Sequence, residues 1–152
     1  TGSVPGAGSA MWWVSTTAAD LAADAYLAQL ASGSNLALLS YTGSKVCLTV
    51  NDCAGHSQVI DSGLALTADD GAVFVGAQMD AGATARLLVA RNGVATKAEG
   101  SLSGYTAMPV ARTIRYGGSA AGARLQHGAV VYGTPIQGAT ALDLAAARLG
   151  HL

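Results

Sequence analysis

Residues 84–98, with the sequence TARLLVARNGVATKA, are typical of a β-hairpin and restrict the fold more than any other stretch of the chain. Asn92 and Gly93 lie between two strand-like runs, and this pair suits a type I′ turn, which needs positive φ at both central residues. The side chains of residues 86–91 alternate between two faces, as they do on an extended backbone. The segment therefore predicts two antiparallel strands joined by a two-residue turn.

Short strand-like segments separated by turn residues occupy much of the remaining chain. Turn signals recur about every eight to twelve residues, which is typical of an antiparallel sandwich with little helix. Residues 20–31 fit both a helix and a strand, because periodicity does not separate the two over so short a run. We therefore predict an all-β fold of two antiparallel sheets. The expected strands are residues 11–14, 35–41, 45–50, 57–61, 72–80, 84–92, 94–98, 112–116 and 124–132.

One helix is expected, close to the end of the sequence. Thr140 is a suitable N-cap, and Asp143 favours the first turn because its charge opposes the helix dipole. The apolar stripe of this helix consists of Leu142, Ala145, Ala146 and Leu149. At the other end, residues 1–9 are expected to form a flexible lead-in. The 152 residues are expected to form a single domain, 1–152.

Charged residues make up only 11% of the chain, and the net charge is −1. Such a chain has no strong positive electrostatic potential to attract nucleic acid or an anionic membrane, so neither is an expected partner. The uncharged stretch between Asp24 and Lys45 is interrupted by polar residues and is not a membrane span. The scarcity of charge has two interpretations. One is a bias toward glycine and alanine, and the other is a surface covered by neighbouring chains in an assembly.

The two cysteines, Cys47 and Cys53, are close in sequence. If the chain reverses at Asn51 and Asp52, the two thiols come close enough for a disulfide, which would stabilise the fold by roughly 2 kcal/mol in the chain-entropy model. A disulfide would imply an oxidising location. Two buried free thiols are the alternative, and the sequence leaves both open. The spacing is not that of a redox motif or a zinc site.

The sequence predicts no catalytic, cofactor-binding or metal-binding residue. Glu99 is the single glutamate, and Asp69 and Asp70 are adjacent, so they would point to opposite faces of a strand. Residues 100–104 (GSLSG) resemble a serine-nucleophile motif, but leucine holds the nucleophile position. The histidines are far apart in sequence, which argues against a shared metal ion. They are His56, His127 and His151.

Aromatic side chains beside polar loops are the feature expected of a sugar-binding surface. Trp12 and Trp13 are adjacent on an expected strand, so they point to opposite faces and at least one of them is expected in the core. Each tyrosine is more simply a half-buried strand residue with a solvated hydroxyl. The candidates for sugar contact are Trp12, Tyr41, Tyr105, Tyr116 and Tyr132.

Residues 64–98 resemble the centre of laminin-G-like, concanavalin A-like lectin-glucanase jelly rolls. In that family a core strand, a turn, an "LYVNG" strand and a return strand follow one another, and the domain closes with a strand, a turn and a short helix. Residues 10–14 and 35–50 resemble the early strands. The matching positions are 72–77 (AVFVGA), 80–82 (DAG), 88–93 (LVARNG), 129–136 (AVVYGTPI) and 140–145 (TALDLA).

The resemblance implies a jelly-roll sandwich. It also raises two properties found in the family, glycoside hydrolysis and calcium binding. Glycoside hydrolases on this fold use two carboxylates, commonly alternating on one strand, and no such pair occurs here. Calcium is bound between loops in many members, which makes it the one cofactor to consider. The chain departs from the family at Ala72 and Val73, where Trp-His is usual. The oxygen donors for calcium would be Asp61, Asp69, Asp70 and Asp80.

We expect a non-catalytic structural or decorating module of a viral particle, on its capsid or tail surface, or of a similar assembly. Its partners would be other protein chains, including copies of itself, and its location extracellular or on the virion surface. The alternative is a carbohydrate-binding or adhesion module of a bacterial extracellular protein, with glycans as partners. A glycoside hydrolase is a distant third.

Overall fold

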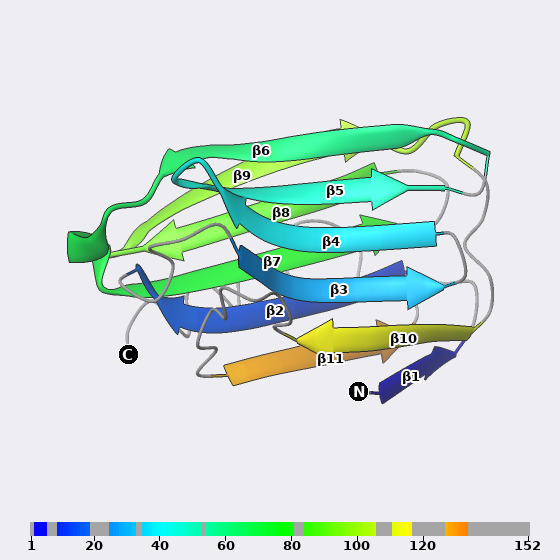
Figure 1. The fold of residues 1–152 in the computed structure, drawn as a ribbon, viewed down its shortest axis with the longest axis horizontal. Helices are drawn as coiled ribbons and strands as arrows, with labels where there is room; N and C mark the ends of the chain where they lie inside the picture. The colour runs from blue at the N-terminus through cyan, green and yellow to red at the C-terminus, as the bar shows by residue number, and fades with distance from the viewer. Residues whose placement is uncertain are drawn as a thin grey trace.

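Eleven strands form two antiparallel sheets in the part of the chain that the computed structural model describes (Figure 1). Six strands form one sheet and five form the other. The described residues are 2–5, 9–18, 25–32, 35–52, 54–80, 84–105, 111–116 and 127–133. Among them, no helix has the length and apolar character to cross a membrane.

The six-stranded sheet is continuous from β3 to β6 as a meander, in which each strand pairs with the next. Two strands from distant parts of the sequence extend its other side. In spatial order the strands are β1 (Gly2–Pro5), β10 (Ala111–Tyr116), β3 (Ala25–Ser32), β4 (Asn35–Thr42), β5 (Lys45–Asn51) and β6 (Ser57–Ala65).

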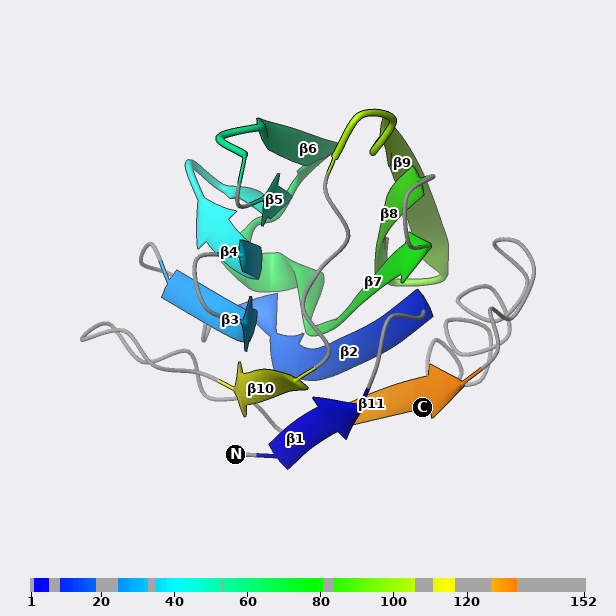
Figure 2. The same cartoon turned by 90° about the vertical axis from the view of Figure 1, so that its right-hand side faces the viewer.

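The five-stranded sheet contains the predicted hairpin at one edge. The edge strands β6 and β9 of the two sheets lie side by side and close one flank of the sandwich (Figure 2). A side chain at Gly100 would lie 2.7 Å from the Gln58 amide, so glycine permits this close approach. In spatial order the strands are β11 (His127–Gly133), β2 (Ser9–Thr17), β7 (Ala72–Asp80), β8 (Thr84–Arg91) and β9 (Val94–Ser101).

The core lies between the sheets and is built from alternate residues of each strand. In β5, Val46, Leu48 and Val50 are buried and the residues between them are partly exposed. In β8, Leu87 and Val89 face them from the other sheet. Each fully buried side chain of this size contributes roughly 1.5–3 kcal/mol, so the alternating pattern supplies most of the driving force for stacking the sheets.

The predicted hairpin is confirmed. Arg91 pairs with Val94 across the turn, and the two central residues have positive φ, 47° for Asn92 and 74° for Gly93. These are the values that a two-residue turn requires, because its twist matches that of the flanking strands. The fold class, an antiparallel two-sheet sandwich, is confirmed as well.

The structure settles one open alternative and corrects one expectation. In the stretch left open between helix and strand, Ala25–Ser32 is a strand, β3. The lead-in expected over residues 1–9 is wrong for Gly2–Pro5, because these residues form β1 and pair with β10. Backbone pairing along a sheet edge outweighed the glycine-rich composition. The expected helix at residues 140–149 lies outside the described residues, and the single domain 1–152 stays a prediction.

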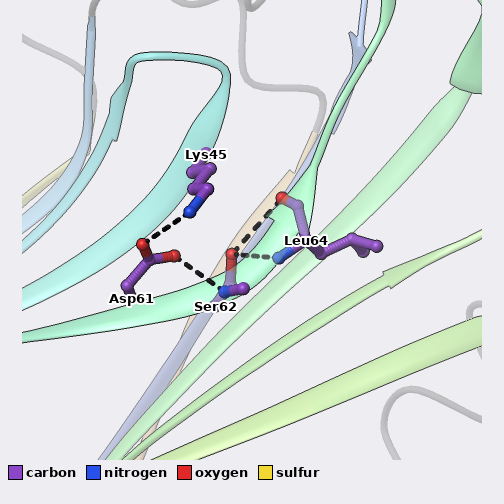
Figure 3. A network of polar contacts seen from close by, with 5 residues as sticks. Lys45, Asp61, Ser62 and Leu64 are labelled. Atoms are coloured by element: carbon purple, nitrogen blue, oxygen red, sulfur yellow. Dashed lines mark hydrogen bonds and ion pairs between the residues drawn. The ribbon is translucent and has the colours of Figure 1, made fainter.

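The strand predicted at residues 57–61 continues to Ala65 through a bulge that interrupts its pairing with β5. Figure 3 shows the polar contacts of Lys45, Asp61, Ser62 and Leu64 in this region. Gly63 has a φ of 70°, and its N–H donates to Asp61 Oδ1 at 2.7 Å. Asp61 Oδ2 accepts a hydrogen bond from Lys45 Nζ at 2.9 Å. A bulge and a charge pair at the edge of a sheet discourage pairing with another strand.

Candidate functional site

The described acidic residues form isolated pairs with basic or polar groups rather than a catalytic or metal-binding cluster. On the exposed face of the hairpin, Glu99 Oε1 accepts from Arg86 Nε at 2.9 Å. Asp70 is buried and binds Arg91, whereas its neighbour Asp69 is exposed. Within the described ranges, no three His, Cys, Asp or Glu side chains form a group that could hold a metal ion.

The fold does not bring the four proposed calcium-binding residues together. Asp61 is bound to Lys45 and to the Gly63 N–H on the edge strand β6. Asp69 and Asp70 lie in a short 3-10 helix, Ala68–Asp70, in the connection between the sheets. Asp80 is the last residue of β7, and its side chain lies outside the described residues. Asp61 and Asp70 already bind cationic side chains, so neither offers free carboxylate oxygens to calcium.

The most organised polar cluster lies at the end of the sandwich opposite the Asn92–Gly93 turn, where the loop between β5 and β6 meets the chain that follows β9. Asp52 has only 1% of its side chain exposed, and its Oδ2 lies 2.7 Å from His56 Nδ1. Asp52 Oδ1 accepts the backbone N–H groups of Ala54 and His56, at 2.9 and 2.8 Å. The loop is closed by the Asp52 N–H, which donates to the His56 carbonyl at 3.0 Å.

His56 is therefore held in one orientation, with its ring packed beside that of Tyr105. The two ring centroids are 5.3 Å apart. About half of the His56 side chain is exposed, at 52%, and Tyr105 is partly buried against the core. A buried carboxylate that binds Nδ1 leaves Nε2 as the nitrogen available to a ligand. Nothing in the sequence singles out His56, because the cluster depends on Tyr105, which is distant in the chain.

The other aromatic candidates divide between buried and undescribed side chains. Tyr41 is 8% exposed and belongs to the core, so it does not reach a ligand. Tyr105 is the remaining candidate whose side chain is described. By backbone register, Trp12 pairs with Ala77, a core residue, and Trp13 pairs with Gly76. The side chains of Trp12, Tyr116, Tyr132 and His127 lie outside the described residues, as does all of His151.

Cys47 lies within β5, on the face that points away from the core, and pairs in register with Ser40 and Asp61. Burial raises the pKa of its thiol, the nearby Asp61 charge raises it further, and Lys45 opposes them. Strand β5 continues through Asn51, which pairs with Ser57. Cys53 lies outside the described residues, so the Cys47–Cys53 disulfide stays a prediction.

The outer face of β3 to β6 in the six-stranded sheet combines polar residues with exposed apolar ones. A row of paired residues crosses it from β3 to β6 and combines Gln29 and Thr49 with the apolar Leu38 and Val59. Tyr26 and Val59 are the large apolar residues most exposed here, at 48% and 62%. Neither residue could be identified from the sequence, because side-chain alternation indicates that one face of a strand points outward but does not indicate whether a partner covers that face.

Two stacked antiparallel sheets with this strand order and an apolar core between them define a jelly-roll β-sandwich. No protein-family model matches the chain, and no curated protein sequence matches it. Solved structures are similar, including the LG1-3 region of the laminin alpha2 chain, with a TM-score of 0.66 and 13% identity over 84% of this chain and 29% of that chain. The botulinum neurotoxin serotype C1 binding domain has a TM-score of 0.45 and 9% identity, over 83% and 31%.

The chain therefore has the concanavalin A-like jelly-roll fold that the resemblance to laminin-G-like domains implied. It spans less than a third of the length of either solved chain. At this level of identity the likeness concerns the fold alone.

Proposed function

We propose that this domain is a non-catalytic module that binds other protein chains, including copies of itself, within an assembly. The setting that we favour is the capsid or tail surface of a viral particle, or a comparable extracellular assembly. The chemistry of the described residues supports a binding role, because four of their acids, Asp52, Asp61, Asp70 and Glu99, are engaged in separate pairs.

The observation that carries this proposal is the scarcity of charge on the outer face of strands β3 to β6, which adjoin β10, where Arg115 pairs in register with Gln29. Strands β3 to β6 contain two charged residues, Lys45 and Asp61, and these two pair with each other. Among the described side chains of β3 to β6, the outer face otherwise consists of polar groups, the Cys47 thiol and the apolar Tyr26, Leu38 and Val59. Interface cores are depleted in charge, and the described outer face of β3 to β6 shares that depletion.

The β6 edge of the same sheet is less suited to association. β6 is bulged and carries an ion pair, which hinders edge-to-edge pairing. A partner is therefore expected to pack on the face, burying side chains, rather than to extend the sheet by a strand.

The test compares Val59→Lys with the control Val94→Lys by sedimentation velocity over a range of concentrations. Both valines are exposed, at 62% and 58%, so neither change disturbs the core. Val94 follows the hairpin turn on the other sheet. We expect the wild-type chain to self-associate, Val59→Lys to weaken association, and Val94→Lys to leave it intact. A wild-type chain that stays monomeric throughout, or equal effects of the two variants, would contradict the proposal.

A carbohydrate-binding or adhesion module is the second candidate, and the packing of His56 against Tyr105 favours it. The pair offers an aromatic surface and a ring nitrogen oriented by Asp52, which are groups that contact sugars. A glycan array separates the two candidates. Binding that is lost in both His56→Ala and Tyr105→Ala, in a chain that stays monomeric, would favour carbohydrate binding over assembly.

A further inference from the structure

The hairpin turn between β8 and β9 contains a chemically reactive pair, Asn92 and Gly93, and both residues are exposed. The carboxamide carbon of an asparagine can be attacked by the backbone nitrogen of the next residue, which closes a succinimide ring and releases ammonia. Glycine leaves this nitrogen unshielded because it has no Cβ. The other asparagines, Asn35 and Asn51, precede a leucine and an aspartate. Asn92 is therefore the asparagine whose sequence most favours loss of the amide group.

The conformation of the closed turn opposes this reaction. Ring closure brings the Gly93 nitrogen onto the same side of the Asn92 Cα–C bond as Cβ. A type I′ turn instead holds ψ of its first central residue at about +30°, where that nitrogen lies nearly opposite to Cβ. The φ values of 47° for Asn92 and 74° for Gly93 are those of such a turn. The attacking nitrogen therefore reaches the carboxamide only when the turn opens.

Two contacts hold the closed turn against the connection between β6 and β7. Arg91, the residue before the turn, binds the buried carboxylate of Asp70. The Asn92 side chain lies beside Gly71, where an added Cβ would be 4.0 Å from Asn92 Oδ1. The Gly71 carbonyl is itself anchored, because it accepts the Ala18 N–H at 2.7 Å. Since Arg91 and Asn92 are consecutive, rotation of Asn92 into the reactive conformation disturbs both contacts.

We propose that Asn92 is a latent deamidation site, and that the Asp70–Arg91 pair protects it by holding the turn closed. When the turn opens, the Gly93 nitrogen gives its proton to water and bonds to Cγ of Asn92, and the amide group takes up a proton and leaves as ammonia. Water then opens the succinimide at one of its two carbonyls and leaves aspartate or isoaspartate at position 92. This inference does not rest on the proposed function, because it concerns the chemistry of one chain.

The two products have different consequences for the hairpin. Aspartate followed by glycine still suits a type I′ turn. Isoaspartate carries the main chain through its side chain and adds a methylene to the backbone, so a two-residue turn no longer closes Arg91 onto Val94 in the register of the hairpin. An opening of the turn is then recorded as a permanent change at the edge of the five-stranded sheet.

Peptide mapping of the wild-type chain tests the protection. The full chain is incubated at one pH and temperature, folded or in denaturant, and conversion of each asparagine is followed with time. In denaturant we expect Asn92 to convert faster than Asn35 and Asn51. In the folded chain we expect Asn92 to convert at least about tenfold more slowly than in denaturant, because local opening populates only a small fraction of molecules. No conversion of Asn92 in denaturant, or equal rates in the two states, would overturn the proposal.

Two variants test the role of the ion pair. Asp70→Ala and its control Asp69→Ala each remove one charge from the same connection, but only the first releases Arg91, because Asp69 is exposed. Under conditions in which circular dichroism shows both variants folded, we expect Asn92 to deamidate several-fold faster in Asp70→Ala and at the wild-type rate in Asp69→Ala. Equal rates in the two variants would overturn the protective role of the pair. The wild-type comparison needs no variant, so it tests the site even if Asp70→Ala folds poorly.

Discussion

The carboxylate of Asp70 binds the guanidinium of Arg91, twenty-one residues further along the chain. Asp70 lies in the connection between the two sheets, and Arg91 is the last residue of β8. The same carboxylate accepts the Thr67 N–H at 2.6 Å, so one buried acid holds both the connection and the end of the hairpin strand. Arg91 continues the core-facing row of β8, and the pair neutralises its charge at the rim of the core.

Asp70→Ala should destabilise the fold by about 3–5 kcal/mol, because it leaves the partly buried Arg91 without its counter-charge. The matched control is Glu99→Ala, which removes the exposed partner of Arg86 and should cost about 0–1 kcal/mol. Denaturant titration of the two variants checks the difference. Similar losses in both would show that the Asp70–Arg91 pair is no more important than a surface ion pair.

Gly93→Val should destabilise the fold by more than about 1 kcal/mol, because a β-branched residue is strained at positive φ. The φ of Gly93 is 74°, and nothing else lies close to the position. The effect would therefore come from the backbone rather than from a clash. Ala95→Val, an exposed strand position two residues further on, should be nearly neutral. An unchanged melting temperature in Gly93→Val would mean that the turn is not type I′ in solution.

Asp61 should titrate below its ordinary value near 3.8, because the Gly63 N–H and the Lys45 side chain both lower its pKa. A lowered folded-state pKa contributes stability above the unfolded-state value, and this contribution is lost as the pH falls through the folded-state value. The stability difference between wild type and Asp61→Asn should therefore shrink in strong acid. NMR titration of Asp61 checks the pKa directly, and Lys45→Gln should raise it. A titration midpoint at or above 3.8 would contradict the expectation.

The Cys47–Cys53 disulfide can be tested by intact mass measurement without reductant. The bridge predicts a mass lower by two hydrogens and no reaction with a thiol reagent until a reductant is added. In the reduced chain, Cys47 should react slowly at neutral pH, because its raised pKa keeps the thiol protonated. Two thiols that react without reductant would remove the bridge.

The hairpin and the alternation of β5 could be predicted because their causes are local. Asn92 and Gly93 select the turn by their own backbone preferences, and alternation follows from the geometry of an extended chain. The conformation of β3, a strand rather than a helix, was not decided by local preferences. Ala25–Ser32 is rich in alanine and leucine, which favour helices, yet it pairs with β4 on one side and β10 on the other. Backbone pairing with two neighbours overrode the intrinsic preference.

The candidate site could be predicted only in part. Tyr105 was among the aromatic candidates, but nothing in the sequence indicates that it lies beside His56, because His56 lies in the loop between β5 and β6 and Tyr105 lies in the chain that follows β9. The binding of Asp52 to His56 spans four residues and depends on the closure of one loop. Neither contact produces a repeating pattern of residues that could be recognised in the sequence.

The sequence by itself determined the class of this protein, a sparsely charged antiparallel sandwich, because turn chemistry and side-chain alternation act over a few neighbouring residues. Only the tertiary structure decided which polar groups meet, as Asp70 meets Arg91, and which faces are covered, as the burial of Leu88 shows. These outcomes depend on how the sheets stack and on what lies against them. Both conditions arise between residues far apart in the chain.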